Sequence, residues 1–143
     1  MRQLNSNLRI GVEYNAGVGE VGFVGNWRAL SETRTRPALI FGTSSDRIGT
    51  PRGQSYFATL SKSLQPTLGI PVSPYVGVSY SGYEKKLLYP YGVNIGLSRQ
   101  WSTMYMHDGA ASHVSATYNW QHYGVTLLAV RKRKLGINLS TGF

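Results

Sequence analysis

The sequence predicts an all-β fold, and more specifically a closed antiparallel transmembrane β-barrel of eight to ten strands that occupies residues 1–143 as a single domain. Apolar and polar residues alternate with a period of two along most of the chain, which is the pattern of strands with two unlike faces. No long segment carries the apolar stripe of a helix. The face opposite the apolar residues is mainly Gly, Ser, Asn and Thr, small side chains that fit a narrow lumen.

The first half of the chain supplies five of the predicted strands. Residues Leu8, Ile10, Val12 and Tyr14 alternate in the first strand, and Val21, Phe23 and Trp27 in the second. Pro37 and Pro74 stand near the starts of the third and fifth strands, where a missing N–H does least harm. Long loops are expected over 43–53 and 63–72. The five strands are 7–15, 18–29, 37–42, 54–62 and 73–82.

The second half supplies five more strands, over 90–98, 100–106, 112–120, 122–130 and 134–143. Their alternating apolar residues are Tyr91, Val93, Ile95 and Leu97, then Val114, Ala116, Tyr118 and Trp120, and finally Leu135, Ile137 and Leu139. If 37–42 and 100–106 merge with loops or neighbouring strands, the count falls to eight. Both counts are even, as transmembrane barrels of this type require.

The apolar face is predicted to contact lipid. Tyr and Trp residues gather near strand ends on this face, as in the interfacial belts of membrane barrels. They are Tyr14, Trp27, Tyr56, Tyr80, Tyr91, Trp101, Tyr118 and Trp120. The residues expected to face lipid include Val76, Val78, Tyr91, Val93, Ile95, Leu97, Val114, Ala116, Tyr118, Leu135, Ile137 and Leu139. The alternative is a soluble barrel or sandwich with the apolar face turned inward.

Composition excludes several other classes of protein. The chain has no Cys, which rules out a disulfide scaffold, a thiolate zinc site and a cysteine nucleophile. Its longest apolar stretch, 125–130, is far shorter than the roughly 20 residues of a membrane helix. Residues 1–7 lead into no apolar run of a signal peptide, so we expect an intracellular chain or a mature sequence with an added Met.

Four charged residues on the first two strands are predicted to point into the lumen. Arg9, Glu13, Glu20 and Arg28 fall on the polar face, with Glu13 roughly opposite Glu20 if the hairpin tip lies near 16–17. Facing carboxylates need cations nearby, which Arg9, Arg28 or Lys62 could supply. Such a network, together with Phe57 and Tyr75, would plug the lumen. The alternative is that these residues sit in water near the rim.

The last strand resembles the C-terminal targeting strand of Gram-negative outer-membrane barrels. That class ends in an aromatic residue, usually Phe, with apolar residues at every second position before it. Phe143, Leu139, Ile137 and Leu135 fit, whereas Thr141 is a weaker match. The resemblance implies a bacterial outer-membrane location, insertion by the barrel-assembly machinery, and membrane lipids or lipopolysaccharide as partners.

His113 and Ser115 form the one pair that resembles a catalytic site. Two residues apart on a strand, they share a face, so the imidazole could activate the hydroxyl. A lipid A deacylase family of small outer-membrane barrels carries a similar His-x-Ser motif. That motif continues with Asn where this chain has Ala116, and its acid follows the Ser, whereas no Asp or Glu follows Asp108. We expect a hydrogen-bonded lumen histidine and keep a lipid-modifying hydrolase as the alternative.

No metal site or cofactor is expected. His107 and Asp108 are adjacent candidate ligands, but zinc needs three or four ligands and His122 lies in a different turn.

The basic surplus is predicted to form a rim that binds lipid phosphates. The chain has 15 Lys plus Arg against 6 Asp plus Glu, a formal charge of +9. With the N-terminus on the periplasmic side, the outward loops hold Arg47, Arg52, Lys85, Lys86, Arg131, Lys132, Arg133 and Lys134, against Asp46, Glu84 and Asp108. A soluble basic β-barrel that binds nucleic acid or a small ligand is the remaining alternative. Nucleic acid is the less favoured partner, because these cations lie at hairpin tips rather than along one strand face with the aromatics.

Overall fold

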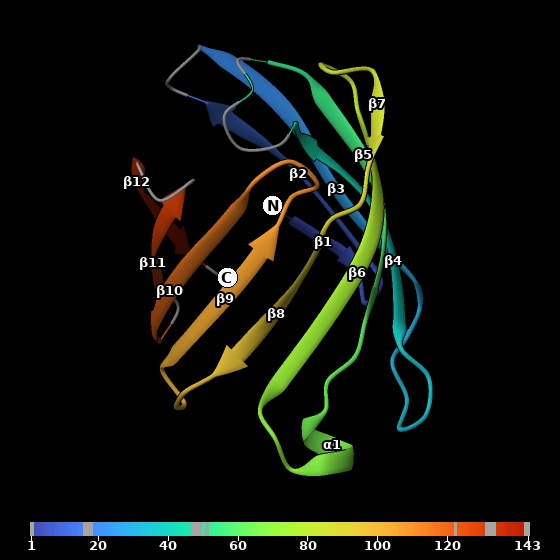
Figure 1. Ribbon diagram of the computed structural model, residues 1–143, viewed down its shortest axis with the longest axis vertical. Coiled ribbons are helices and arrows are strands. Elements are labelled where there is room, and N and C mark those ends of the chain that lie inside the picture. The colour runs from blue at the N-terminus through green and yellow to red at the C-terminus, as the bar shows by residue number, and fades with distance from the viewer. Residues whose placement is uncertain are drawn as a thin grey trace.

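The computed structural model describes residues 2–15, 19–46, 50, 52–121, 123–130 and 134–141. Within them the fold is all-β, and the strands form one antiparallel sheet (Figure 1). The strands are β1 (Arg2–Asn5), β2 (Leu8–Asn15), β3 (Glu20–Leu30), β4 (Ala38–Ser45), β5 (Gln54–Ser61), β6 (Val72–Ser81), β7 (Lys86–Leu88), β8 (Tyr91–Gly96), β9 (Trp101–His107), β10 (Ser112–Trp120), β11 (Tyr123–Val130) and β12 (Lys134–Thr141). One short helix, α1 (Gln65–Leu68), lies in the loop between β5 and β6.

All ten predicted strands are present, and two short strands are added to them. The merger of 37–42 and 100–106 into other elements is wrong, because β4 and β9 are separate strands with partners on both sides. The additional strand β1 exists because the Asn5 side chain accepts hydrogen bonds from the backbone N–H groups of Asn7 and Leu8, both at 2.8 Å. This Asx turn folds residues 2–5 back along β2. The other, β7, follows the turn after β6 and pairs with its end.

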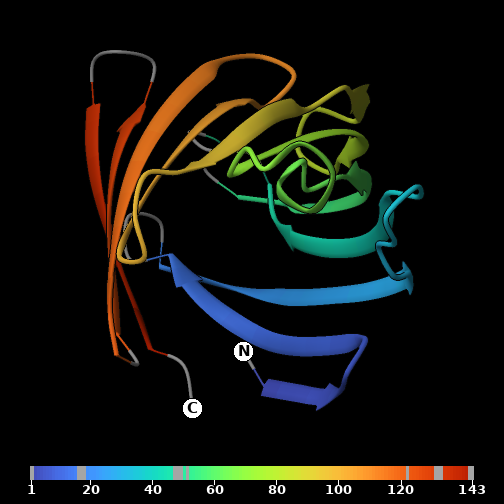
Figure 2. The ribbon, with the colours of Figure 1, turned by 90° about the horizontal axis from the view of Figure 1, so that it is seen from below.

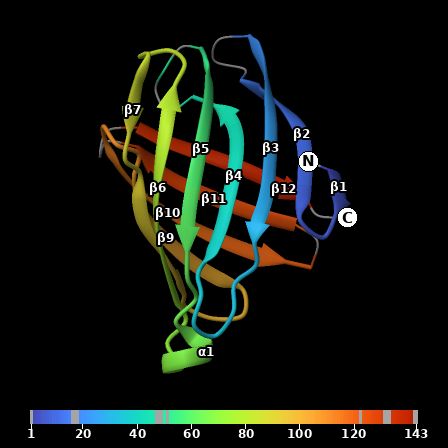
Figure 3. The ribbon, with the colours of Figure 1, turned by 90° about the vertical axis from the view of Figure 1, so that its right-hand side faces the viewer.

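The sheet curls on itself, so that β9 to β12 stand opposite β2 to β6 (Figure 2). The strands of the two halves cross at a steep angle when viewed from the side (Figure 3). Neighbours follow the order β1-β2-β3-β4-β5-β6-β8-β9-β10-β11-β12, with β7 beside β6. The predicted closure into a barrel is not observed, since the ladders of the described residues end at β1 on one edge and β12 on the other. None of the helices in the described ranges has the length and apolarity that a membrane span requires.

The concave side, here called the inner face, carries the small polar residues that the alternation predicted. Two glycines make room there for aromatic rings from neighbouring strands. Gly42 lies opposite Phe57 in the β4–β5 ladder, and a Cβ at Gly42 would collide with the Phe57 ring. A Cβ on Gly92 would come within 2.8 Å of the Tyr75 hydroxyl. The expectation that Phe57 and Tyr75 fill part of the interior is therefore confirmed.

The convex side, here called the outer face, is apolar, and the described residues contain almost no apolar core. Among the residues whose burial is described, Ala38 and Leu88 are the only buried hydrophobic ones, whereas the buried polar residues are Ser55, Ser81, Asp108, His113 and Ser115. Most of the residues expected to face lipid are exposed, including Val76 at 57%, Val114 at 50% and Leu135 at 89%. The side-chain distribution is thus the reverse of a water-soluble domain, which buries its apolar side chains.

Aromatic side chains gather at both ends of the outer face. Tyr56 and Tyr80 are direct cross-strand partners at the end of the sheet where β6 finishes. Near the opposite end, Trp101 packs against Tyr118 with ring centroids 4.9 Å apart, and Trp27 stacks on Phe41 at 5.8 Å. These contacts contribute about 0.5–1.5 kcal/mol each beyond simple burial.

Candidate functional site

The inner face holds two polar groups of residues at opposite ends of the sheet. At the end formed by the β4–β5, β6–β7 and β9–β10 turns lie Asp46, Asp108 and His113. At the other end, near the β1–β2 turn, lie Arg9 and Arg28. Arg9, Arg28 and His113 point inward because of the alternation along their strands. Asp46 and Asp108 directly follow the ends of β4 and β9.

The predicted network of Arg9, Glu13, Glu20 and Arg28 does not form within the described residues. The β2–β3 ladder pairs Glu13 with Gly22 and Asn15 with Glu20, so the two carboxylates are not directly opposite each other. The Glu13 carboxylate instead accepts a hydrogen bond of 2.5 Å from the backbone N–H of Ser45. Arg9 and Glu13 lie four residues apart on an extended strand, about 13 Å. That separation explains why they do not pair.

Glu20 and Lys62, the other charged residues considered for this network, also lie apart from it. Glu20 lies at the rim beside Arg52 and Tyr83, where the three help to line a shallow hollow. Lys62 pairs with Glu32 at 3.4 Å rather than with the inward carboxylates. Glu13 is bonded to Ser45 and Glu20 lies at the rim, so neither inward arginine pairs with a carboxylate among the described residues.

Asp108 and His113 form a buried pair. The Asp108 Oδ2 atom lies 2.8 Å from His113 Nε2, and its Oδ1 atom accepts from the backbone N–H groups of Ala110 and Ala111 at 2.9 and 2.7 Å. Burial opposes ionisation of this carboxyl, but the hydrogen bonds from His113, Ala111 and Ala110 outweigh it and hold the pKa of Asp108 below its ordinary value. The carboxylate therefore connects the turn between β9 and β10 to His113 on the inner face.

His113 and Ser115 do lie on the inner face, as the alternation predicted, with 1% and 5% of their surfaces exposed. The His113 Nδ1 atom is buried and makes no hydrogen bond within the described part of the chain. For His113 to act as the general base of Ser115, one of its ring nitrogens would have to accept a hydrogen bond from the Ser115 hydroxyl. The described contacts of His113 do not include this bond. Sequence reasoning missed Asp108 as the partner of His113, although the tight turn over 108–111 was the signal that brings them together.

The neighbouring His107 belongs to the outer face. Its Nδ1 atom lies 3.1 Å from the Ser112 hydroxyl, and its ring packs on Tyr91 with centroids 5.1 Å apart. His107 and Asp108 therefore point to opposite sides and cannot share a metal ion. His122 falls outside the described residues, among which no group of three metal-ligating side chains occurs.

A cavity of about 270 Å³ adjoins the Asp108 carboxylate and was not anticipated from the sequence. Asp46 lies on its wall, where it accepts hydrogen bonds from the Ser81 hydroxyl at 2.8 Å and the Tyr83 N–H at 2.9 Å. A further hydrogen bond of 2.7 Å joins the Ser55 and Ser79 hydroxyls beside it. These bonds tie the loops of this end together.

The predicted basic rim is described only in part. The antiparallel order places the turns after β2, β4, β6, β9 and β11 at one end of the sheet. Arg52, Lys85 and Lys86 lie at this end, and Lys86 pairs with Glu84 at 3.3 Å. The other predicted members fall outside the described residues: Arg47, Arg131, Lys132, Arg133 and the side chain of Lys134.

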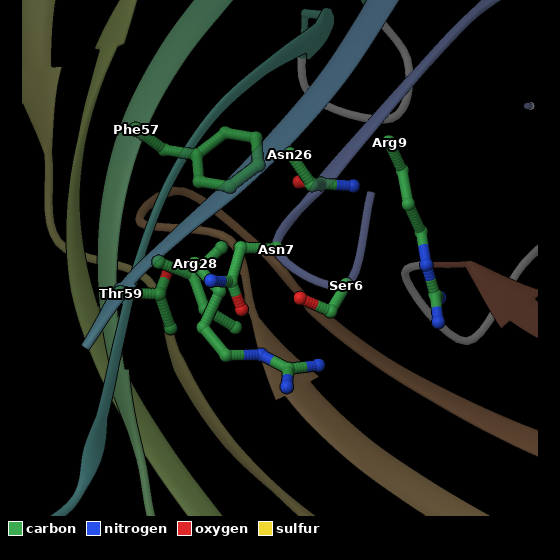
Figure 4. A pocket seen from close by; sticks show the side chains of 8 residues that line it. Ser6, Asn7, Arg9, Asn26, Arg28, Phe57 and Thr59 are labelled. Carbon is green, nitrogen blue, oxygen red and sulfur yellow. The ribbon is translucent and has the colours of Figure 1, made fainter. Parts of the chain in front are cut away.

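A second cavity, of about 290 Å³, opens at the other end of the inner face. Figure 4 shows Arg9 and Arg28 extending from β2 and β3 toward the same side of this cavity, with Ser6 between their guanidinium groups in this view. We call it the arginine pocket. Its polar lining consists of Ser6, Asn7, Arg9, Asn26, Arg28 and Thr59.

Comparison with known proteins gives no match: no family model, no curated protein and no solved structure corresponds to this chain.

Proposed function

We propose that this chain is a small outer-membrane β-barrel whose outer face contacts lipid acyl chains, with a structural or binding role in the cell envelope. The observation that carries the proposal is the reversed side-chain distribution. Thirty large apolar or aromatic side chains are exposed among the described residues, and two apolar residues are buried. A monomeric soluble protein rarely exposes an apolar patch of more than a few hundred Å². In a bilayer these side chains contact lipid acyl chains, so their exposure to water no longer destabilises the protein.

The positions of the aromatic residues support the same proposal. Tyr14, Tyr56 and Tyr80 lie near one end of the sheet, and the three tryptophans lie near the other. All six are exposed on the outer face, with Trp27, Trp101 and Trp120 at 53%, 48% and 59%. Two such belts, separated by aliphatic residues such as Val76 and Val78, match the two interfaces and the hydrocarbon core of a bilayer.

A membrane location requires closure of the sheet, because unpaired backbone groups at a lipid-exposed edge are too costly. Nine antiparallel steps separate β2 from β12 in the strand order, so these two strands run in opposite directions. Pairing between them would close a ten-stranded antiparallel barrel. By contrast, β1 runs parallel to β12 and covers only Leu8 to Ile10 of the β2 edge. Closure would start at the uncovered part, residues 11–15.

Cysteine cross-linking in lipid vesicles tests this closure. The sequence contains no native Cys, so the two introduced thiols are the only ones that can form an intramolecular disulfide. Val12 on β2 is replaced by Cys together with Leu135, Ile137 or Leu139 on β12, one pair at a time. All four side chains are exposed on the outer face, so one of the three registers should bring the thiols into bonding range. We expect one pair to oxidise to a disulfide in vesicles.

The matched control combines Val12→Cys with Val114→Cys, which lies on the outer face of β10, two strands from the edge. This pair should stay reduced. If none of the β12 pairs forms a disulfide in folded, vesicle-bound protein, the sheet does not close through β2 and β12.

The two alternatives receive less support. A hydrolase would need His113 to contact Ser115, and the His113 Nδ1 atom makes no such hydrogen bond. A soluble barrel would need a buried apolar core, whereas Ala38 and Leu88 are the only buried hydrophobic residues in the described part of the chain. The rim cations Arg52 and Lys85 are consistent with contact to the phosphates of lipopolysaccharide, each contributing roughly 1 kcal/mol at low salt.

A further inference from the structure

The arginine pocket has the properties of an anion-binding site. Arg9 pairs with Asn26 across the β2–β3 ladder, and Arg28 is the next inward residue along β3. Such diagonal neighbours lie about 7–8 Å apart, which is within reach of two guanidinium groups that contact one ligand. Neither guanidinium makes a side-chain hydrogen bond or ion pair within the described residues.

The other polar groups of the pocket are suited to complete the coordination of an oxyanion. Hydroxyls of Ser6 and Thr59 and amides of Asn7 and Asn26 line it, and all of them can donate hydrogen bonds. The described residues that line it include no Asp or Glu. The nearest inward acid along β2, Glu13, is already bound by the Ser45 N–H. Two like charges held side by side without a carboxylate favour a doubly charged ligand.

We infer that the arginine pocket binds a small organic phosphomonoester. Its phosphate carries a charge between −1.5 and −2 at pH 7, which matches the two arginines, and guanidinium groups bind phosphate oxygens in pairs. The cavity of about 290 Å³ is larger than inorganic phosphate alone needs. Phe57 and Ile40 supply an apolar wall for the organic part of the ligand.

This site lies on the inner face and goes beyond the membrane assignment, since it exists whichever environment covers the outer face. The phosphomonoester could be a free solute or the headgroup of a phosphorylated lipid that reaches in from the rim. The chemistry is the same for both, and the binding experiment separates the two sources.

Binding is measured by isothermal titration of the full chain in neutral detergent micelles. The probes are phenyl phosphate and phenyl sulfate, which differ in charge but share the aromatic group. Phenyl phosphate should bind, and it should bind more tightly at pH 7.5 than at pH 5 because its second ionisation lies near pH 6. Phenyl sulfate should bind more weakly and without this pH dependence.

The variant Arg9→Gln/Arg28→Gln should weaken phenyl phosphate binding about tenfold for each arginine replaced. Its control is Arg34→Gln/Arg99→Gln, which removes the same charge from exposed turns outside the pocket and should leave the affinity unchanged. Arg9→Lys/Arg28→Lys keeps the charge but loses the planar fork, so it should bind at intermediate strength. Unfolding midpoints of all three variants confirm that they fold.

Two outcomes would overturn the proposal. One is that the glutamine double variant binds phenyl phosphate as tightly as the wild type. The other is that phenyl sulfate binds as tightly as phenyl phosphate at pH 7.5. Vesicles that contain phosphatidic acid identify the source: saturable binding there that phenyl phosphate displaces only weakly assigns the site to a lipid headgroup, and easy displacement assigns it to a free solute.

Discussion

Replacing Val76 with Lys separates a lipid-facing sheet from a water-facing one by the size of the stability loss. Val76 is the fifth of the ten residues of β6, midway between the two ends of the strand. Its outer-face neighbours across the ladders are Leu60 and Tyr91. At 57% exposure, Val76 has no packed core to lose. In water, a substitution at such a site changes the free energy of unfolding by about 0.5 kcal/mol or less.

In a bilayer, the same position lies near the midplane of the hydrocarbon. A Lys there costs about 2–4 kcal/mol, which falls toward zero near the interfaces. Val76→Lys should therefore destabilise the protein by 2–4 kcal/mol in vesicles of a neutral lipid, by the same estimate. The free energy is measured by reversible urea unfolding, followed by tryptophan fluorescence and extrapolated linearly to zero denaturant.

Two controls fix the interpretation of that loss. Leu68→Lys changes an equally exposed residue, at 60%, in the loop helix α1 outside the strands. Asn94→Lys adds the charge to the inner face of the neighbouring strand β8. Each of these two substitutions should lower the free energy of unfolding by less than about 1 kcal/mol. If Val76→Lys is as mild as these two, the outer face does not lie in hydrocarbon and the reasoning is refuted.

The Asp108–His113 pair yields the remaining predictions. Asp108→Asn keeps an acceptor for the Ala110 and Ala111 N–H groups but loses the charge-assisted hydrogen bond to His113. The free energy of unfolding should therefore fall by about 1–3 kcal/mol at pH 7. An unchanged free energy of unfolding would mean that the pair does not stabilise the turn. Because the folded pKa of Asp108 lies below its ordinary value, its contribution is complete above pH ~4 and is lost as pH falls through the folded pKa. Wild-type stability should therefore converge on that of the variant in acid, as urea titrations from pH 7 to pH 2.5 would reveal.

Strand positions and facing were predictable because both depend on local patterning. The alternation in β10 gives the inward side chains of His113 and Ser115 and the outward side chain of Val114 directly, since successive residues of a strand point to opposite sides. The same pattern gave the separate strand β9, although its seven residues are short for a membrane strand.

The register between strands was less accessible to sequence reasoning. The prediction placed Glu13 opposite Glu20, but the ladder places Gly22 there. The hairpin length alone does not fix the register, and a shift of two residues keeps every side chain on its own face. The hydrophobic pattern therefore cannot distinguish between two registers that differ by two residues. The predicted charge network failed for this reason.

Long-range partners were also beyond the sequence. The hydrogen bond from the Ser45 N–H to Glu13 joins residues 32 positions apart, and nothing in the local composition indicates it. The arginine pocket combines a turn made by Asn5 with residues of four different strands, so it emerges only when the sheet curls. Closure is likewise a relation between the two ends of the sheet rather than a local property.

The most direct test of the account is the depth of the three tryptophans in a bilayer. Trp27, Trp101 and Trp120 are the only tryptophans of the chain, all are exposed on the outer face, and all lie near the same end of the sheet. Fluorescence quenching is measured in vesicles with lipids brominated at different depths, and with acrylamide in the aqueous phase. The account predicts strong quenching by lipids brominated near the headgroup, weaker quenching by deeply brominated lipids, and protection from acrylamide. Full quenching by acrylamide with no effect of the brominated lipids would contradict it.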